Sequence, residues 1–242
     1  MTLRAYGSLF GARYGSLPPH VLALHGWGRT RADFDGLLRG YEAVALDLPG
    51  FGASPPPDEP IGAAGYAELI EAVLSEFGVP PVVVGHSFGG RVAVSLAAAR
   101  PDAVAGLVLA GVPLVRRSSP VAKPARRFRL LRRARRIGLI SEERLERARR
   151  KFGSDDYRAA SGVMRGVLVK VVNESYEDEL GRLECPVRLV WGERDAAVPV
   201  AVAASAVSLI ADGTLEVVEG AGHDVHLSHP DRVRAAIDGL FA

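Results

Sequence analysis

The segment that most constrains this chain is a serine between a short apolar run and an alanine-rich run, with a glycine two residues away on each side. Val82–Val84 are β-branched and typical of a buried strand. Gly90–Ala99 has the composition of a helix and ends before a proline. Gly85 and Gly89 permit a sharp turn, so we predict that Ser87 lies in strained backbone at the carboxyl edge of a sheet. The alternative is a glycine-rich turn without chemistry.

Short apolar runs alternate with helical patterns along most of the chain. The predicted strands are Val21–Leu24, Val44–Leu46, Val82–Val84, Leu107–Leu109, Val187–Trp191 and Leu215–Val218. The predicted helices are Tyr66–Phe77, Gly90–Arg100, Val200–Ile210 and Pro230–Leu240. This alternation indicates an α/β fold, with a mostly parallel twisted sheet and helices on both faces. Residues 2–14 are expected to form an antiparallel hairpin at the start.

The alternation stops between residues 113 and 180, where we find only helical patterns. These patterns are Phe128–Ile137, Leu145–Phe152 and Tyr157–Val171. A helical insertion between two parallel strands lies over their carboxyl edge, where such sheets bind ligands. We therefore predict one α/β core, residues 1–112 and 181–242, with a helical lid of residues 113–180.

Composition narrows the class of protein. The chain has 242 residues, 48% hydrophobic and 24% charged, as in ordinary globular proteins. Its apolar runs are too short for a membrane span, and Met1–Tyr6 lacks the apolar core of a signal peptide. Cys185 is the single cysteine, so it forms no intrachain disulfide and is expected to be structural. We expect a cytoplasmic protein that is not an integral membrane protein.

Positive charge is concentrated in the expected lid. Arg116–Lys151 contains 13 arginines and 2 lysines against 3 glutamates, a net charge of +12 in a chain whose total is +2. Such a segment can bind an acidic partner, for example an acidic carrier protein or an anionic surface. A solvated helix face without a partner is the alternative. Nucleic acid is not expected, because Phe128 is the one aromatic residue available for stacking.

A serine hydroxyl needs a base, and the base needs a group to orient it. His223 ends the glycine-rich segment Gly220–His223, directly after the last predicted strand, so its imidazole can reach the sheet edge. His226 and His229 are alternatives, but they lie at or near the start of the following helix and are expected to point inward less.

The orienting carboxylate is expected after another strand, between the serine and the histidine in sequence. Val187–Trp191 is followed by Glu193 and Asp195. Asp195 is preferred, because Gly192 opens the turn and a helix begins soon after the aspartate. Glu193 is the alternative and is expected to face solvent. The resulting chain order of serine, aspartate and histidine is the one found with this type of turn.

Acyl transfer also needs N–H donors for the oxyanion. The backbone N–H of Phe88, directly after the serine, is one candidate. The backbone N–H of Trp27 is the other, because Gly26 and Gly28 let this loop turn an amide inward. His25, at the end of the preceding strand, is expected to brace the loop by hydrogen bonding rather than act as a base.

Five motifs in this order resemble the α/β-hydrolase family over nearly the whole chain. They are His25–Gly28, Asp47–Ser54, Gly85–Gly89, Trp191–Asp195 and Gly220–His223. The resemblance includes the small-lid carboxylesterases and the carboxylesterases that cleave pimeloyl-carrier-protein methyl ester, whose acidic carrier a basic lid would suit. It implies a structural role for the Asp47 segment. Serine at the turn argues against haloalkane dehalogenases and epoxide hydrolases, which use a carboxylate there.

These residues together predict a serine hydrolase that cleaves a carboxylic ester through an acyl-enzyme. The predicted catalytic residues are Ser87, His223 and Asp195, with Trp27 and Phe88 as oxyanion donors. No metal and no cofactor is expected. A thioesterase, a carbon–carbon bond hydrolase, a lactonase or a perhydrolase could use the same residues. A receptor that keeps the triad for ligand capture is an alternative outside enzymology.

Overall fold

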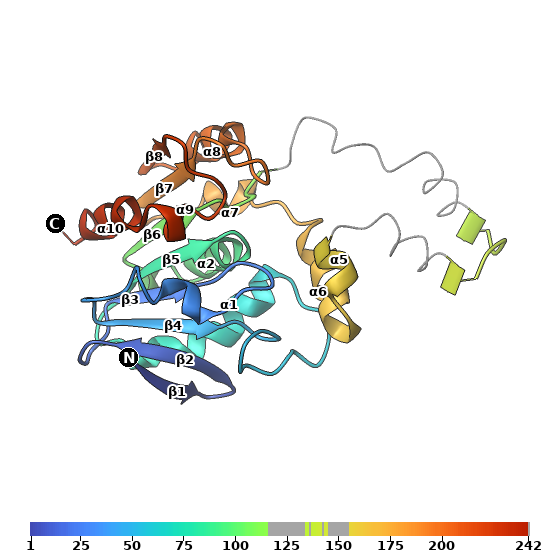
Figure 1. Cartoon of the computed structure of the whole chain (residues 1–242), viewed down its shortest axis with the longest axis horizontal. Helices are drawn as coiled ribbons and strands as arrows, with labels where there is room; N and C mark the ends of the chain where they lie inside the picture. The colour runs from blue at the N-terminus through green and yellow to red at the C-terminus, as the bar shows by residue number, and fades with distance from the viewer. Residues whose placement is uncertain (116–133, 136, 142, 145–154, 242) are drawn as a thin grey trace.

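The computed structural model describes residues 1–115, 134–135, 137–141, 143–144 and 155–241 (Figure 1). In these residues, eight strands form one sheet in the order β1-β2-β4-β3-β5-β6-β7-β8. The strands are β1 (Thr2–Tyr6), β2 (Leu9–Tyr14), β3 (Val21–Leu24), β4 (Ala43–Asp47), β5 (Val82–His86), β6 (Gly106–Ala110), β7 (Val187–Gly192) and β8 (Gly213–Val218). Pairing is parallel from β4 to β8, while β2 is antiparallel to both β1 and β4. The predicted α/β fold and the leading hairpin are confirmed.

The strand residues alternate between two hydrophobic clusters, one on each face of the sheet. In β3, Leu22 and Leu24 belong to one cluster, and Val21 and Ala23 belong to the other. The first face is covered by α1 (Ala63–Glu71), α2 (Phe88–Ala99) and α8 (Val200–Val207). The second is covered by η1 (Arg31–Phe34), α9 (Val225–Ser228) and α10 (Pro230–Asp238). Because both faces are covered, the central strands are apolar throughout rather than alternating with polar residues.

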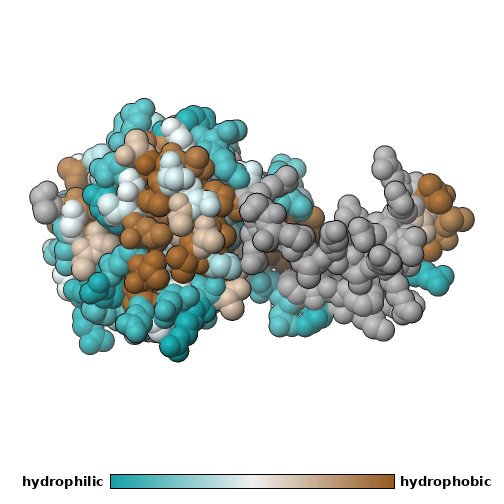
Figure 2. Space-filling model, turned by 90° about the horizontal axis from the view of Figure 1, so that it is seen from above, coloured by the Kyte–Doolittle hydropathy of each residue, from teal (hydrophilic) through white to brown (hydrophobic). Residues whose placement is uncertain are grey.

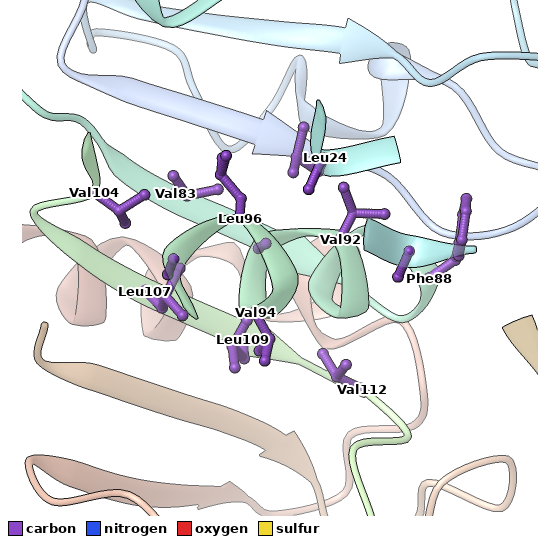
Figure 3. Packing of buried hydrophobic residues seen from close by; sticks show 14 of the residues in the cluster. Leu24, Val83, Phe88, Val92, Val94, Leu96, Val104, Leu107, Leu109 and Val112 are labelled. Carbon is purple, nitrogen blue, oxygen red and sulfur yellow. The ribbon is translucent and has the colours of Figure 1, made fainter. Parts of the chain in front are cut away.

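Helix α2 is the most buried of the described helices, with ten of its twelve residues buried. Figure 3 shows Val92 near Leu24 and Leu96 near Val83, all within one hydrophobic cluster. A helix buried on nearly all sides has little freedom to move. The sheet and its neighbouring helices therefore determine where the first turn of α2 lies.

Three short helices follow the segment that is not described: α5 (Asp155–Ala159), α6 (Gly162–Val171) and α7 (Glu177–Leu180). The pattern from Tyr157 to Val171 predicts one helix, but the helix is interrupted at Ala160 and Ser161, before Gly162, whose φ is 52°. The predicted helices at 128–137 and 145–152 fall mainly outside the described residues, as does most of Arg116–Lys151. The division into core and lid stays a prediction.

Other differences are at helix ends and in short turns. The helix predicted from Tyr66 to Phe77 begins earlier, at Ala63, and tightens into the 3₁₀ segment η2 (Ala72–Glu76). A further 3₁₀ turn, η3 (Pro101–Ala103), follows α2. Seen from above, the surface of the body mixes apolar residues in brown with hydrophilic residues in teal (Figure 2). Within the described part of the chain, no helix has the length and hydropathy needed to cross a membrane.

Two buried histidines lie where β3 and β5 end. His25 is 0% exposed and His86 is 2% exposed. The Nε2 atom of His25 accepts a hydrogen bond from Leu48 N at 2.9 Å, so its Nδ1–H donates to Gly26 O at 2.7 Å. His25 therefore braces the loop, as predicted. Burial lowers the pKa of His25, and for His86 burial together with the nearby His226 and His223 lowers the pKa well below its usual value.

Stability is expected to fall as the pH drops below about 6.5, the ordinary histidine value. Below this pH the unfolded chain binds protons that the buried imidazoles of His25 and His86 do not bind, so the free energy of unfolding decreases. Each histidine contributes a slope of up to about 1.4 kcal/mol per pH unit within its window. Chemical denaturation between pH 7.5 and 5 measures it. The slope should be shallower in His86→Gln and unchanged in the control His229→Gln; equal slopes in all three proteins would contradict the assignment.

Candidate active site

Ser87 lies at the turn between β5 and α2, as predicted. Its φ and ψ are 48° and −110°, and among the described residues it is the one non-glycine with positive φ. Its backbone N–H donates to Ala110 O at 2.9 Å, and its own carbonyl accepts from Gly90 N at 3.2 Å. Such backbone is costly for an L-residue and is found where the surroundings enforce it. The side chain is half-buried at the start of the helix.

Close packing explains the glycines on either side of Ser87. A Cβ atom on Gly85 would lie 2.4 Å from Gly90 Cα, and one on Gly89 would lie 2.1 Å from Leu24 O. Neither contact is possible for real atoms, and backbone cannot move away as a side chain can. The turn therefore requires glycine at both positions, because α2 lies very close to β3 and to β5, the strand that precedes it.

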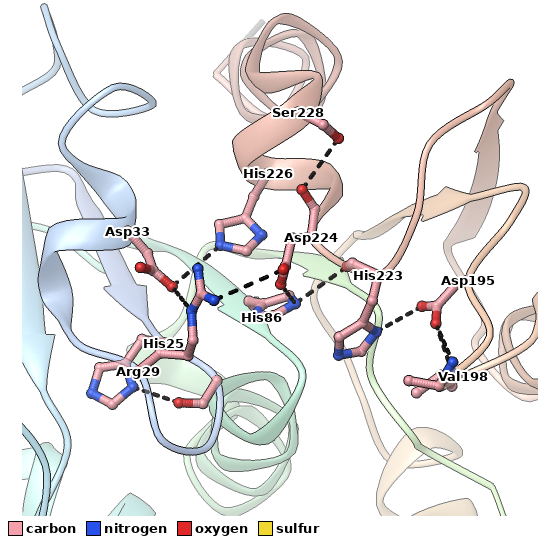
Figure 4. A network of polar contacts seen from close by, with 12 residues as sticks. His25, Arg29, Asp33, His86, Asp195, Val198, His223, Asp224, His226 and Ser228 are labelled. Carbon is pink, nitrogen blue, oxygen red and sulfur yellow. Dashed lines mark hydrogen bonds and ion pairs between the residues drawn. The ribbon is translucent and has the colours of Figure 1, made fainter.

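Asp195 and His223 come together from the loops that follow β7 and β8. His223 Nδ1 lies 2.8 Å from Asp195 Oδ2, and Asp195 is 4% exposed (Figure 4). The other carboxylate oxygen, Oδ1, accepts from Ala197 N at 2.9 Å and from Val198 N at 2.7 Å. Three hydrogen bonds thus fix the carboxylate, and its contact assigns the Nδ1 proton of the imidazole.

The carboxylate and the two histidines that were alternatives to Asp195 and His223 contact other groups. Glu193 is exposed, and its Oε2 accepts from Gly220 N at 3.0 Å. His229 contacts Ser228 Oγ through Nδ1 at 3.0 Å, away from Asp195. The expectation that His226 points inward less is wrong, since it is 1% exposed, and its ring centroid lies 4.1 Å from that of His86. Sequence reasoning missed this because α9 is a single turn without a periodic pattern.

The two predicted oxyanion donors line the same cavity as Ser87, Phe88 as its neighbour in sequence and Trp27 from the loop after β3. Phe88 is the first residue of α2, where backbone N–H groups have no partner within the helix. Trp27 lies in a turn closed by the hydrogen bond from Arg29 N to Gly26 O at 3.2 Å. The rings of Trp27 and Phe88 pack edge to face, with centroids 5.5 Å apart. This contact holds the loop of Trp27 against the first turn of α2.

A cavity of about 500 Å³ is lined by both halves of the site. Ser87, Phe88 and Trp27 line it together with His223. The remaining lining residues come from the loops after β3, β6, β7 and β8, from β5, α2, α5 and α6, and from the end of α6. The structure thus brings all the predicted site residues except the buried Asp195 to one cavity, and Asp195 contacts it through His223.

A polar network lies on the far side of His223 (Figure 4). The Arg29 guanidinium contacts Asp33 through Nε at 2.5 Å and Asp224 through Nη1 at 3.9 Å. Asp33 Oδ2 also lies 3.8 Å from His226 Nε2. Burial favours the neutral form of Asp33, but the contacts with His226 and Arg29 outweigh burial and lower its pKa to about 2. Arg29 therefore lies between two carboxylates.

One group of side chains in this network has metal-ligating chemistry. His86, Asp224 and His226 offer ligand atoms that lie within 4.8 Å of one another in the described structure. A cation there would compete with Arg29, which already contacts Asp224. The group therefore resembles a charge network more than a metal centre.

Asp47 has the structural role that the motif implies. It is 0% exposed, and its Oδ1 accepts from Arg31 N at 2.9 Å while Oδ2 accepts from Ala53 N at 2.9 Å. The Arg31 guanidinium also contacts it. The carboxylate thus closes the loop after β4 around itself. Cys185 is buried as expected, and burial raises the pKa of its thiol to about 11, which disfavours the reactive thiolate.

Comparison with known proteins agrees with this fold. The model of the Alpha/beta hydrolase family matches residues 21–236. A pimeloyl-[acyl-carrier protein] methyl ester esterase of Chromobacterium violaceum is 30% identical, over 92% of this chain and 94% of its own. A 2-hydroxy-6-oxononadienedioate/2-hydroxy-6-oxononatrienedioate hydrolase of Cupriavidus pinatubonensis is 26% identical, over 84% of this chain and 78% of its own.

Solved structures share the architecture at low sequence identity. An esterase from Rhodococcus sp. ECU1013 has a TM-score of 0.70 and 23% identity, covering 99% of this chain and 98% of its own. A putative lipase from Acinetobacter baumannii AYE has a TM-score of 0.73 and 19% identity, covering 99% and 90%. The family model and the 30% identical relative confirm what the five motifs predict: the chain belongs to the α/β-hydrolase family.

Proposed function

We propose that the protein is a serine hydrolase that cleaves carboxylic esters through an acyl-enzyme intermediate. The observation that carries the proposal is the Asp195–His223 pair, 2.8 Å apart, in contact with the cavity that Ser87 lines. The similarity to an esterase at 30% identity supports the same reaction class. Ser87 is the nucleophile, His223 the general base and Asp195 the group that orients the base.

The first half of the reaction follows from the protonation of His223. Its Nδ1–H donates to Asp195, so Nε2 carries the free lone pair and accepts the proton of Ser87 Oγ. The serine oxygen then bonds to the ester carbonyl carbon. The carbonyl oxygen becomes an oxyanion, which the N–H groups of Trp27 and Phe88 stabilise by about 3 kcal/mol per donor.

The second half regenerates the enzyme. The imidazolium of His223 gives its proton to the leaving alcohol, and the ester C–O bond breaks to leave an acyl group on Ser87. Water then enters, His223 takes one of its protons, and the hydroxide adds to the acyl carbon. Collapse of this second intermediate returns the proton to Ser87 and releases the carboxylic acid. No metal or cofactor takes part in this scheme.

The same residues can act on other bonds. A thioesterase, lactonase, perhydrolase or carbon–carbon bond hydrolase would need the same nucleophile and base, and one relative, at 26% identity, is a hydrolase of 2-hydroxy-6-oxo dioic acids by its name. Carboxylic ester cleavage is favoured by the more similar relative. A receptor would differ from all of these, because it would form a stable complex after at most one turnover.

Replacement of the nucleophile tests the class. Ser87→Ala should lose at least about 10³-fold in kcat for p-nitrophenyl esters, because no acyl-enzyme can form. A fluorophosphonate probe should label the wild-type protein and leave Ser87→Ala unlabelled. Full esterase activity in purified, folded Ser87→Ala would contradict the mechanism, and single-turnover release by the wild type would favour the receptor.

Replacement of the orienting carboxylate separates Asp195 from Glu193. Asp195→Asn keeps the shape but donates where the carboxylate accepts, so the imidazole adopts the wrong tautomer and kcat should fall by about 10³- to 10⁴-fold. The matched control Glu193→Gln changes the exposed carboxylate two residues earlier and should stay within about threefold of the wild type. Ester hydrolysis at pH 8, with circular dichroism to verify folding, measures both. Equal losses in the two variants would exclude the assignment.

The basic segment Arg116–Lys151 suggests a partner for this esterase. Its net charge of +12 complements an acidic carrier protein or an anionic surface, and the 30% identical relative acts, by its name, on an acyl-carrier-protein ester. This segment belongs to the helical lid that we propose for residues 113–180. An acidic carrier is favoured over an anionic surface, because the name of the 30% identical relative includes such a carrier.

Salt dependence tests this partner. The kcat/KM for an ester on acyl carrier protein should fall roughly tenfold between 50 and 500 mM NaCl, while that for the free ester should change little. Exchange of Arg132, Arg133, Arg135 and Arg136 for serine should reduce the carrier-bound rate in the same way. A carrier-bound rate that is independent of salt would argue for a solvated surface without a partner, and binding to phosphatidylglycerol vesicles alone would favour a membrane surface.

A further inference from the structure

The cavity contains a buried guanidinium that the proposed reaction does not use. Arg91 lies on α2, four residues after Ser87, and lines the same cavity although the whole residue is 9% exposed. Leu168, Val171 and Val172 line this part of the cavity and are apolar. A charged group among apolar walls is costly unless it is paired.

No carboxylate pairs with Arg91 among the residues that the structure describes, since none lies within 4 Å of its guanidinium. Its Nη1 donates one hydrogen bond, to Val171 O at 2.6 Å, and its buried Nε has no partner. The bond to Val171 connects α2 to the last residue of α6, which explains one of the five N–H groups. The other N–H groups are available to Tyr176 and to a ligand in the cavity.

The nearest polar groups compensate the positive charge of Arg91 only in part. Tyr176 presents its ring 5.8 Å from the guanidinium carbon, and its hydroxyl group also interacts with Arg91. Glu174 is engaged elsewhere, because its Oε2 accepts from Tyr176 Oη at 2.7 Å and from Ala63 N at 3.2 Å. Burial lowers the pKa of Arg91, and Tyr176 and Glu174 offset burial only in part. An anion that entered the cavity would supply the missing charge.

Arg29 shows by contrast what a compensated arginine in this cavity looks like. It also lines the cavity, but it lies between Asp33 and Asp224 and is about one-third exposed. Its charge is therefore already balanced. Of the two arginines in the described lining, Arg91 is the one that has charge left for a ligand.

The position of Arg91 indicates which part of a substrate it meets. Residues four apart lie on one face of a helix, about one 5.4 Å turn from each other. The leaving alcohol must lie beside His223, which also lines the cavity and protonates the alcohol in the proposed reaction. An acyl chain that extends from Ser87 over the first turn of α2 towards α6 would reach Arg91.

We propose that Arg91 binds a carboxylate at the far end of a short acyl chain, so that free half-esters of dicarboxylic acids are substrates beside the carrier-bound ester proposed above. This proposal rests on the proposed ester hydrolysis and names its substrate class. The guanidinium and the carboxylate form charge-assisted hydrogen bonds, which are strong in a partly dry cavity. Arg91 is then a specificity residue, and Ser87 and His223 perform the chemistry.

Matched ester pairs test the proposal in the wild-type protein. Monoethyl adipate and ethyl hexanoate have acyl chains of the same length and differ in the terminal carboxylate. The ratio of kcat/KM for the half-ester to that for the neutral ester should be about 10- to 100-fold, mainly through KM. Monoethyl succinate and monoethyl glutarate give the best chain length. A ratio of one or less at every length would overturn the proposal.

Variants assign the ratio to one arginine. In Arg91→Gln the ratio should fall to about one, and Arg91→Lys should recover part of it because the charge returns. The surface variant Arg232→Gln, whose arginine pairs with Glu216 outside the cavity, should keep the wild-type ratio. If Arg29→Gln loses the ratio and Arg91→Gln keeps it, the carboxylate site belongs to Arg29 and our assignment is wrong.

Binding to an inactive protein separates this proposal from the proposed function. With Ser87→Ala, monoethyl adipate should raise Tm more than ethyl hexanoate at equal concentration, because a ligand that binds the folded state stabilises it. This difference should vanish in Ser87→Ala/Arg91→Gln. If the wild type neither hydrolyses esters nor reacts with the fluorophosphonate, ester hydrolysis fails, but the Tm difference still supports the carboxylate site. If the two ligands shift Tm of Ser87→Ala equally, the carboxylate site fails, whatever the esterase activity.

Discussion

The close approach of the first turn of α2 to the ends of β3 and β5 is the constraint on which the site depends. Side-chain atoms are absent at Gly85 and Gly89 because the backbone of the neighbouring segments lies where they would be. This packing holds Ser87 at a positive φ and places the Phe88 amide next to the loop of Trp27. A strained residue persists only when its surroundings enforce it, and here the enclosed helix and the sheet do so.

The loops after β7 and β8 complete the site from the other side of the sheet edge. Asp195 accepts two backbone N–H bonds and the His223 contact, so the imidazole is oriented by groups that the backbone itself fixes. Since β5, β7 and β8 run parallel, their carboxyl ends meet at one edge, although Ser87 is more than a hundred positions from Asp195 and His223 in sequence. Parallel topology therefore brings the proposed triad together, which local sequence cannot do.

This topology also explains how much could be predicted from the sequence. Ser87 directly follows β5, and Asp195 and His223 lie in the loops after β7 and β8, so a local pattern predicts their place and the parallel sheet predicts their meeting. The burial of His226 and the break at Gly162 follow from contacts and backbone angles that no periodic pattern encodes. The local sequence does not indicate the role of Arg91 for the same reason, because its burial depends on α6, about eighty residues away in sequence.

The two arginines that line the cavity differ in whether a carboxylate pairs with them. This difference separates a structural role from a role in binding a substrate. Arg29 contacts two carboxylates, those of Asp33 and Asp224, and thereby links the loops after β3 and β8. Arg91 has one hydrogen bond to α6 and an unpaired Nε, so the folded state bears a desolvation cost that a neutral side chain would avoid. A side chain of that kind contributes little to stability. Its place, one helical turn from Ser87, makes recognition of a substrate anion the role that the desolvation cost fits best.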